Sequence, residues 1–191
     1  MIGGFAVATP IDGSLMDFTF GVPLDARTVE LKRRLLEEDL AVEDEQALAE
    51  LVLRVIFLAW RARRRSNVVL CMLRVRALPD KRQVLGERFD VSLRETPLEG
   101  PIEQTFHCTV SLKLFGLLAR IAQLFQMSGV DVLFRAALDT LDMIVTHARR
   151  EQSLCLARIE ILDDVERFDD PIVEVLVACS LPLRKREGGS P

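Results

Sequence analysis

The densest cluster of side chains that could do chemistry is a run of carboxylates near the C-terminus. Five acidic residues fall within one predicted loop: Asp163, Asp164, Glu166, Asp169 and Asp170. Carboxylate oxygens are the ligands that Mg²⁺ and Ca²⁺ prefer, so this loop could gather a divalent cation. The spacing matches no calcium-binding loop, however, and no glycine supplies the tight turn that such a loop needs. We therefore interpret it as a solvated hairpin loop and expect no metal site.

The histidines and cysteines do not form a catalytic pair. His107 lies in a run of alternating apolar residues, where neighbouring side chains point to opposite faces of a strand, so it cannot reach Cys108. His147 is expected near the C-terminus of a helix, where the helix dipole favours a protonated imidazole. The cysteines are widely spaced, form no CxxC pair and each sit in an apolar run, which indicates buried, reduced thiols. They are Cys71, Cys108, Cys155 and Cys179.

Motifs of the common enzyme classes are missing from the sequence. It contains no GxSxG, P-loop, dinucleotide-binding fingerprint or HExxH. The glycine pairs at 3–4 and 188–189 lack the strand–turn–helix context that phosphate binding requires. The sequence therefore predicts a protein that is not an enzyme and uses no cofactor. An enzyme or small-ligand-binding protein with an unmarked pocket is kept as an alternative.

Arginines form the most distinctive candidate site. Basic residues outnumber acidic ones nine to two between positions 61 and 88, whereas positions 37 to 50 hold seven acidic residues and no basic one. A single basic patch would form if the end of a predicted helix lies close to the strand that follows it. Its members would be Arg61, Arg63, Arg64, Arg65, Arg74 and Arg76. Such a patch could bind phosphates or anionic headgroups. The alternative is that it pairs with the acidic block, within one chain or between two copies.

These arginines follow a segment, residues 44–65, that we expect to organise the whole fold. It begins with acidic residues and ends with basic ones, an order that the helix dipole favours. Nine of the ten residues from 51 to 60 are apolar, which indicates a helix buried on most sides.

Turn residues and hydrophobic periodicity divide the rest of the chain into further elements. We expect an N-terminal hairpin at 3–20, a first helix capped by Asp25, and strands within 67–78, 88–94 and 105–114. An almost wholly apolar helix at 115–127 should be buried. A helix at 130–149 should expose Asp131, Arg135 and Asp139 on one face, and two strands should follow at 154–162 and 172–179.

This order of elements, ββαα-βββ-αα-ββ, predicts an α+β fold with a largely antiparallel sheet packed against two helical hairpins. The chain of 191 residues fits a single domain, which we place at 1–181, followed by a disordered basic and polar tail at 182–191. The N-terminus lacks the features of a signal peptide. The apolar segments at 51–60 and 114–127 are too short to span a bilayer. We therefore expect a soluble, cytoplasmic protein.

Two non-enzymatic roles follow from these observations. The first is an interaction or assembly protein that self-associates into a homo-oligomer, because two nearly all-apolar helical segments and two complementary charge blocks are present. The second is a peripheral, matrix-like adaptor that uses the arginines of 61–88 against an anionic membrane surface or a nucleic acid. A further protein partner fits either role.

Overall fold

The computed structural model describes residues 7–9, 16–64, 68–74, 88–150, 154–160, 174–179 and 182–184. Within these ranges, the residues at 7–9, 68–74, 88–90, 154–160 and 174–179 are described as strands without their side chains. The predicted acidic loop at 163–170 lies outside the described residues.

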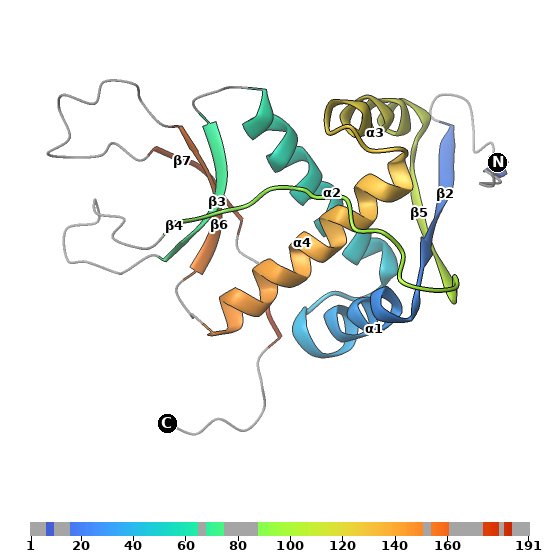
Figure 1. The fold of residues 1–191 in the computed structure, drawn as a ribbon, viewed down its shortest axis with the longest axis horizontal. Helices are drawn as coiled ribbons and strands as arrows, with labels where there is room; N and C mark the ends of the chain where they lie inside the picture. The colour runs from blue at the N-terminus through green and yellow to red at the C-terminus, as the bar shows by residue number, and fades with distance from the viewer. Residues whose placement is uncertain are drawn as a thin grey trace, which may run out of the picture.

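The fold is mixed α+β, as the sequence predicts, with two antiparallel sheets on opposite sides of a group of helices (Figure 1). One sheet has the order β1-β2-β5 and consists of β1 (Val7–Thr9), β2 (Asp17–Leu24) and β5 (Gln104–Ser111). The other has the order β4-β3-β6-β7 and consists of β3 (Val68–Arg74), β4 (Arg88–Asp90), β6 (Leu154–Glu160) and β7 (Glu174–Cys179). The prediction of one sheet is therefore wrong. The two long central helices are apolar on most sides, and one sheet could not cover both of them.

Two long helices, α2 (Glu45–Arg63) and α4 (Val130–Arg150), form the centre of the core. The predicted burial of α2 is confirmed, and its buried residues are Leu48, Ala49, Val52, Leu53, Val55, Ile56, Leu58, Ala59 and Ala62. The predicted apolar face of α4 is likewise buried. Phe134 of α4 contacts the rings of Phe20 in β2 and Phe106 in β5 at centroid distances of 6.0 and 5.3 Å. These contacts attach α4 to the three-stranded sheet.

A shorter helix, α1 (Ala26–Arg34), begins at Asp25 as predicted. The Asp25 carboxylate accepts hydrogen bonds from the N–H and the hydroxyl of Thr28, at 2.9 and 2.7 Å. A π-helix, η1 (Leu35–Asp39), follows α1 directly. The first residues of the segment predicted as a tail lie against it, because Leu183 forms an antiparallel bridge with Leu40.

The remaining helix, α3 (Leu112–Leu124), differs from its prediction in two ways. Strand β5 ends at Ser111, whose hydroxyl accepts a hydrogen bond from the Leu114 N–H at 3.2 Å and caps the helix. The helix therefore begins at Leu112, a residue that the strand pattern assigns to the buried face and that is 51% exposed. The predicted burial of the helix is also wrong. Only Leu118, Ile121 and Ala122 are buried, because α3 packs on the rest of the protein with one side.

Arg135 of α4 also differs from its prediction, because it is 6% exposed rather than on a solvated face. The end of β2 covers this side of α4, and Arg135 donates to the Pro23 carbonyl at 3.3 Å and contacts Asp131 at 3.5 Å. Asp139 pairs instead with Arg27 of α1, at 3.2 Å.

Candidate binding face

Three of the six predicted patch arginines have described side chains, and these three lie together. Arg61, Arg63 and Arg64 occupy the C-terminal end of α2, and all three are exposed. Arg65 and Arg76 lie outside the described residues, and Arg74 lies in β3 without a described side chain. The end of α2 is therefore a basic surface, whichever way the other three arginines point.

Aromatic rings hold two of these arginines in place. The guanidinium of Arg63 lies 5.0 Å from the centre of the Phe125 ring, at the C-terminal end of α3. The guanidinium of Arg64 lies 5.2 Å from the Trp60 ring, which itself packs edge-on against Phe57. Such contacts cover an apolar ring and leave N–H donors facing water. Arg63 therefore joins the end of α2 to the end of α3.

The exposed side of α3 extends this basic surface. At 3.6 residues per turn, its six exposed residues fall within an arc of about 120°. They are Leu112, Lys113, Gly116, Arg120, Gln123 and Leu124. This arc carries two cations and no acidic residue, and its opposite side is the one buried against the core.

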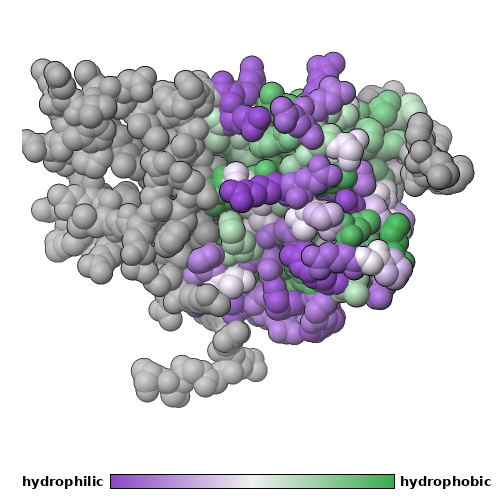
Figure 2. Space-filling model, in the orientation of Figure 1, coloured by the Kyte–Doolittle hydropathy of each residue, from purple (hydrophilic) through white to green (hydrophobic). Residues whose placement is uncertain are grey.

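Large exposed apolar side chains concentrate at the same place. Leu112 and Leu124 are 51% and 42% exposed, and Met16, whose carbonyl accepts the Leu112 N–H at 3.0 Å, is 53% exposed. We call this surface the α3 face. It consists of Arg61, Arg63 and Arg64, the exposed arc of α3, and Met16. In Figure 2, hydrophilic side chains over the C-terminal end of α2 stand beside an apolar area over α3.

The two segments that carry the cations of the α3 face contain no acidic residue, although Asp17 directly follows Met16 in the chain. Neither residues 51–79 nor residues 104–130 contain an aspartate or a glutamate, although the whole chain has a formal net charge of −4. The arginine block was visible in the sequence. The acid-free run at 104–130 is also visible there, but its pattern predicts a strand at 105–114 and a buried helix at 115–127 rather than a binding surface.

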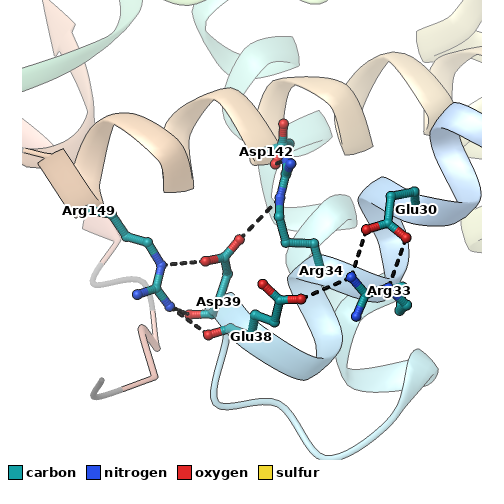
Figure 3. Close-up of polar contacts among 7 residues, drawn as sticks. All are labelled: Glu30, Arg33, Arg34, Glu38, Asp39, Asp142 and Arg149. Atoms are coloured by element: carbon teal, nitrogen blue, oxygen red, sulfur yellow. Dashed lines mark hydrogen bonds and ion pairs between the residues drawn. The ribbon is translucent and has the colours of Figure 1, made fainter. Parts of the chain in front are cut away.

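The acidic block at 37–50 is used differently, in a network at the opposite end of α2. Arg33 of α1 pairs with Glu30, Glu37 and Glu38 at 2.7, 2.9 and 2.9 Å, and Figure 3 draws the pairs with Glu30 and Glu38. These carboxylates raise the pKa of the Arg33 guanidinium, with the hydrogen bond to Glu30 contributing most. Every group in this part of the network is well exposed to solvent.

Asp39 forms the buried part of the network. Its carboxylate lies 2.5 Å from Nε of Arg149 in α4 and 3.5 Å from Arg34, which also binds Asp142. The Asp39 side chain is 10% exposed and that of Arg149 is 15% exposed. Arg149 also donates to the Glu38 and Asp39 carbonyls, at 2.8 and 2.7 Å. We call this network the paired-charge cluster. Figure 3 draws all of its members except Glu37.

Most of the acidic block is therefore engaged within the chain. Besides the acids of the paired-charge cluster, Asp44 caps α2 through the Ala47 N–H at 2.8 Å, and Glu45 pairs with Lys32 at 2.5 Å. Among the described residues, the partners of these acids lie in α1, α2 and α4 and are not Arg61, Arg63 or Arg64. In the described part of the chain, the acidic block at 37–50 therefore does not pair with the arginines at the end of α2.

The candidate catalytic groups do not come together. Cys108 is fully buried, and burial raises the pKa of its thiol to about 11, so the nucleophilic thiolate is scarce at neutral pH. His107 is exposed on the opposite face of β5, as predicted. Cys71, Cys155 and Cys179 lie in β3, β6 and β7, where side chains are not described. Across the described ranges, no three histidine, cysteine or acidic side chains gather in a way that could hold a metal ion.

The helices in the described part of the chain are all too short or too polar to span a lipid bilayer. Comparisons with protein-family models, with curated proteins and with solved structures find no match to this chain. The candidate site is therefore interpreted from its own chemistry.

Proposed function

We propose that this protein is a non-enzymatic adaptor that binds a negatively charged partner through the α3 face. The observation that supports this most is the contrast in pairing between the two ends of α2. Acidic residues are matched by cations in the paired-charge cluster, whereas the two segments that carry the cations of the α3 face, 51–79 and 104–130, contain no acidic residue.

Charges that are not neutralised locally act at a distance. Their field extends for about 8 to 10 Å at physiological ionic strength, which is enough to steer an anionic partner during its approach. Because the chain as a whole is acidic, the rest of its surface opposes the same partner. The uneven distribution of charge thus favours one orientation of binding over all others.

Self-association is the second candidate, and the exposed leucines of the α3 face would support it. A symmetric dimer buries the same patch from both copies. Two copies of the α3 face would therefore place Arg61, Lys113 and Arg120 opposite like charges, which is unfavourable. The acidic block, which could have offered a complementary surface to a second copy, is largely occupied by Arg33, Arg34 and Arg149. An anionic partner fits the α3 face better.

The cytoplasm is the compartment that we propose for this function. Cys108 is a free, buried thiol, which suits a reducing environment. The cytoplasmic leaflet and cellular nucleic acids both present dense negative charge.

Reversing two arginines at the end of α2 tests the proposal. Arg61→Glu with Arg64→Glu leaves the Arg63–Phe125 contact intact. The control is Arg94→Glu, an exposed arginine outside the α3 face that has no ion pair among the described residues and changes the net charge in the same direction by half as much. Binding is measured by co-sedimentation with phosphatidylserine-containing vesicles and by retention of a single-stranded RNA, each at low and high salt.

At about 1 kcal/mol per basic residue, the Arg61/Arg64 variant should bind the preferred probe about 30-fold more weakly, and the control should bind like the wild type. Salt should weaken wild-type binding. Equal losses in both variants, or no binding of either probe by the wild type, would contradict the proposal.

A further inference from the structure

The α3 face combines cations with exposed apolar side chains, and one class of anionic partner can bind both. Its cations are Arg61, Arg63 and Arg64 of α2 together with Lys113 and Arg120 of α3, and exposed leucines stand at both ends of α3. We propose that the partner is a lipid bilayer with anionic headgroups, on which α3 lies flat and inserts Leu112 and Leu124. This inference rests on the proposed function and names its partner.

The composition of α3 supports this placement. Nine of the 13 residues of α3 are apolar, and a helix of this composition normally contacts a core or a membrane over more than one side. The core takes only the side of α3 that carries Leu118, Ile121 and Ala122. Interfacial helices lie with apolar side chains about 5 to 10 Å below the headgroups and with lysine or arginine at headgroup level. Lys113 and Arg120 have long apolar stems that suit this position.

The arginines of α2 supply the first contact in this arrangement. Arg63 contacts Phe125 at the C-terminal end of α3, and Arg61 and Arg64 are its neighbours at the end of α2. Each basic residue near an anionic leaflet adds to attraction that acts before any apolar side chain touches the bilayer. Leu112, with Met16 beside it, then stands at one end of the inserted helix and Leu124 at the other.

A nucleic acid fits the same surface less well. Binding of single strands uses aromatic rings on which bases stack. The exposed arc of α3 carries no aromatic side chain, and the nearby rings of Phe125 and Trp60 are covered by Arg63 and Arg64. A phosphate backbone would not remove the exposed leucines from water, so their burial would add nothing to the affinity. An acidic protein would match the cations, but it would also have to present apolar side chains to both Leu112 and Leu124.

The first experiment separates insertion from electrostatic contact. Leu112→Ser with Leu124→Ser removes the apolar side chains and keeps every charge. The matched control is Ile102→Ser with Met143→Ser, because Ile102 and Met143 are exposed apolar residues outside the α3 face, at 59% and 40%. Co-sedimentation is measured with phosphatidylcholine vesicles that do or do not contain phosphatidylserine.

Loss of two partly exposed leucines should weaken binding to phosphatidylserine vesicles about tenfold, while the control binds like the wild type. Vesicles of phosphatidylcholine alone should bind poorly. If the leucine variant binds like the wild type while Arg61→Glu with Arg64→Glu abolishes binding, insertion is wrong and the proposed function stands. Stronger binding of the single-stranded RNA than of the vesicles would overturn the bilayer as partner.

A second experiment reports the depth of insertion directly. In a Trp60→Phe background, a tryptophan is introduced as Leu112→Trp, or as Ile102→Trp for the control. Vesicles contain phosphatidylserine and a phosphatidylcholine with brominated acyl chains, which quench a nearby indole. Quenching at position 112 and none at position 102 is the expected result. No quenching at position 112, with binding intact, would place the helix above the acyl chains and overturn the inference.

Discussion

The two ends of α2 carry charge in opposite ways. The helix has 19 residues and is therefore about 27 Å long. At its N-terminal end, acids and cations alternate in space and neutralise each other, from Glu30 and Arg33 to Asp39 and Arg149. At its C-terminal end, Arg61, Arg63 and Arg64 stand beside the acid-free helix α3.

The comparison shows that the number of charged residues in a region says little about its role. Paired charges at a solvated surface contribute about 0 to 1 kcal/mol each to stability and leave little field outside the protein. A region with the same number of charges, all of one sign, instead produces an electrostatic field that extends beyond the protein surface. The paired-charge cluster therefore supports the fold, and the α3 face is available for a partner. The variants below separate these two roles, beginning with the one that should abolish both.

Val55→Asp should have the largest effect. Val55 is 2% exposed in the middle of α2, between the two regions. An unpaired carboxylate there has no partner to offset its desolvation, which costs several kcal/mol, comparable to the whole stability of a domain. Far-ultraviolet circular dichroism during a thermal melt should show no cooperative transition. A normal melt would mean that α2 does not organise the fold.

Asp39→Ala should destabilise the protein by about 3 kcal/mol, because it leaves Arg149 partly buried beside Arg34 without its carboxylate. Urea denaturation measures the change. The variant that remains folded should still bind through the α3 face, so loss of stability together with intact vesicle binding is expected. Loss of binding in a fully folded Asp39→Ala protein would show that the two regions are coupled.

Asp25→Asn should lower the free energy of unfolding by about 1 to 2 kcal/mol at neutral pH. The new amide oxygen can still accept from the Thr28 N–H, but the amide NH₂ then faces the Glu99 N–H, and two donors cannot form a hydrogen bond. Burial raises the pKa of Asp25, but hydrogen bonds from Thr28 and Glu99 outweigh it and hold the pKa below 3.8. A carboxyl whose pKa is lower in the folded state stabilises the fold above its unfolded pKa. This stability is lost as pH falls through the folded pKa.

The difference in unfolding free energy between the wild type and Asp25→Asn should therefore be constant near neutral pH and shrink below about pH 4. Urea denaturation across that range measures it. A difference that grows on acidification would mean that folding raises the pKa of Asp25 instead of lowering it.

Arg33→Ala should have the smallest effect, a change in the free energy of unfolding too small to separate from the wild type, although Arg33 contacts three glutamates. Its side chain is 42% exposed, so solvent screens each pair. Urea denaturation beside Asp39→Ala compares an exposed and a buried member of the same network. A loss as large as that of Asp39→Ala would mean that the exposed pairs act as one cooperative unit.

Periodicity and end signals predicted much of the fold from sequence. Asp25 and Asp44 begin their helices, the apolar middle of α2 is buried, and His107 and Cys108 lie on opposite faces of β5. These features depend on local chemistry. The division into two sheets could not be predicted, because alternation along a strand specifies a buried face but not which neighbouring strand it meets.

The α3 face was missed for a related reason. Apolarity from residue 115 to 127 predicts burial, but burial depends on how much of a helix the rest of the protein can cover. The cap at Ser111 also turns Leu112 from a predicted inward position of the strand at 105–114 into the first exposed position of a helix. Arg135 is the converse case, a charge buried by the end of β2. Both outcomes depend on tertiary contacts.

The most direct test of the account uses Trp60, the only tryptophan of the chain, which lies half-buried beside Arg64 at the edge of the α3 face. Its emission is followed while the unmodified protein is titrated with phosphatidylserine-containing vesicles. The account predicts a saturable change in emission that weakens with added salt and is absent with phosphatidylcholine alone. Vesicle binding that leaves Trp60 emission unchanged would place the contact elsewhere on the protein and contradict the account.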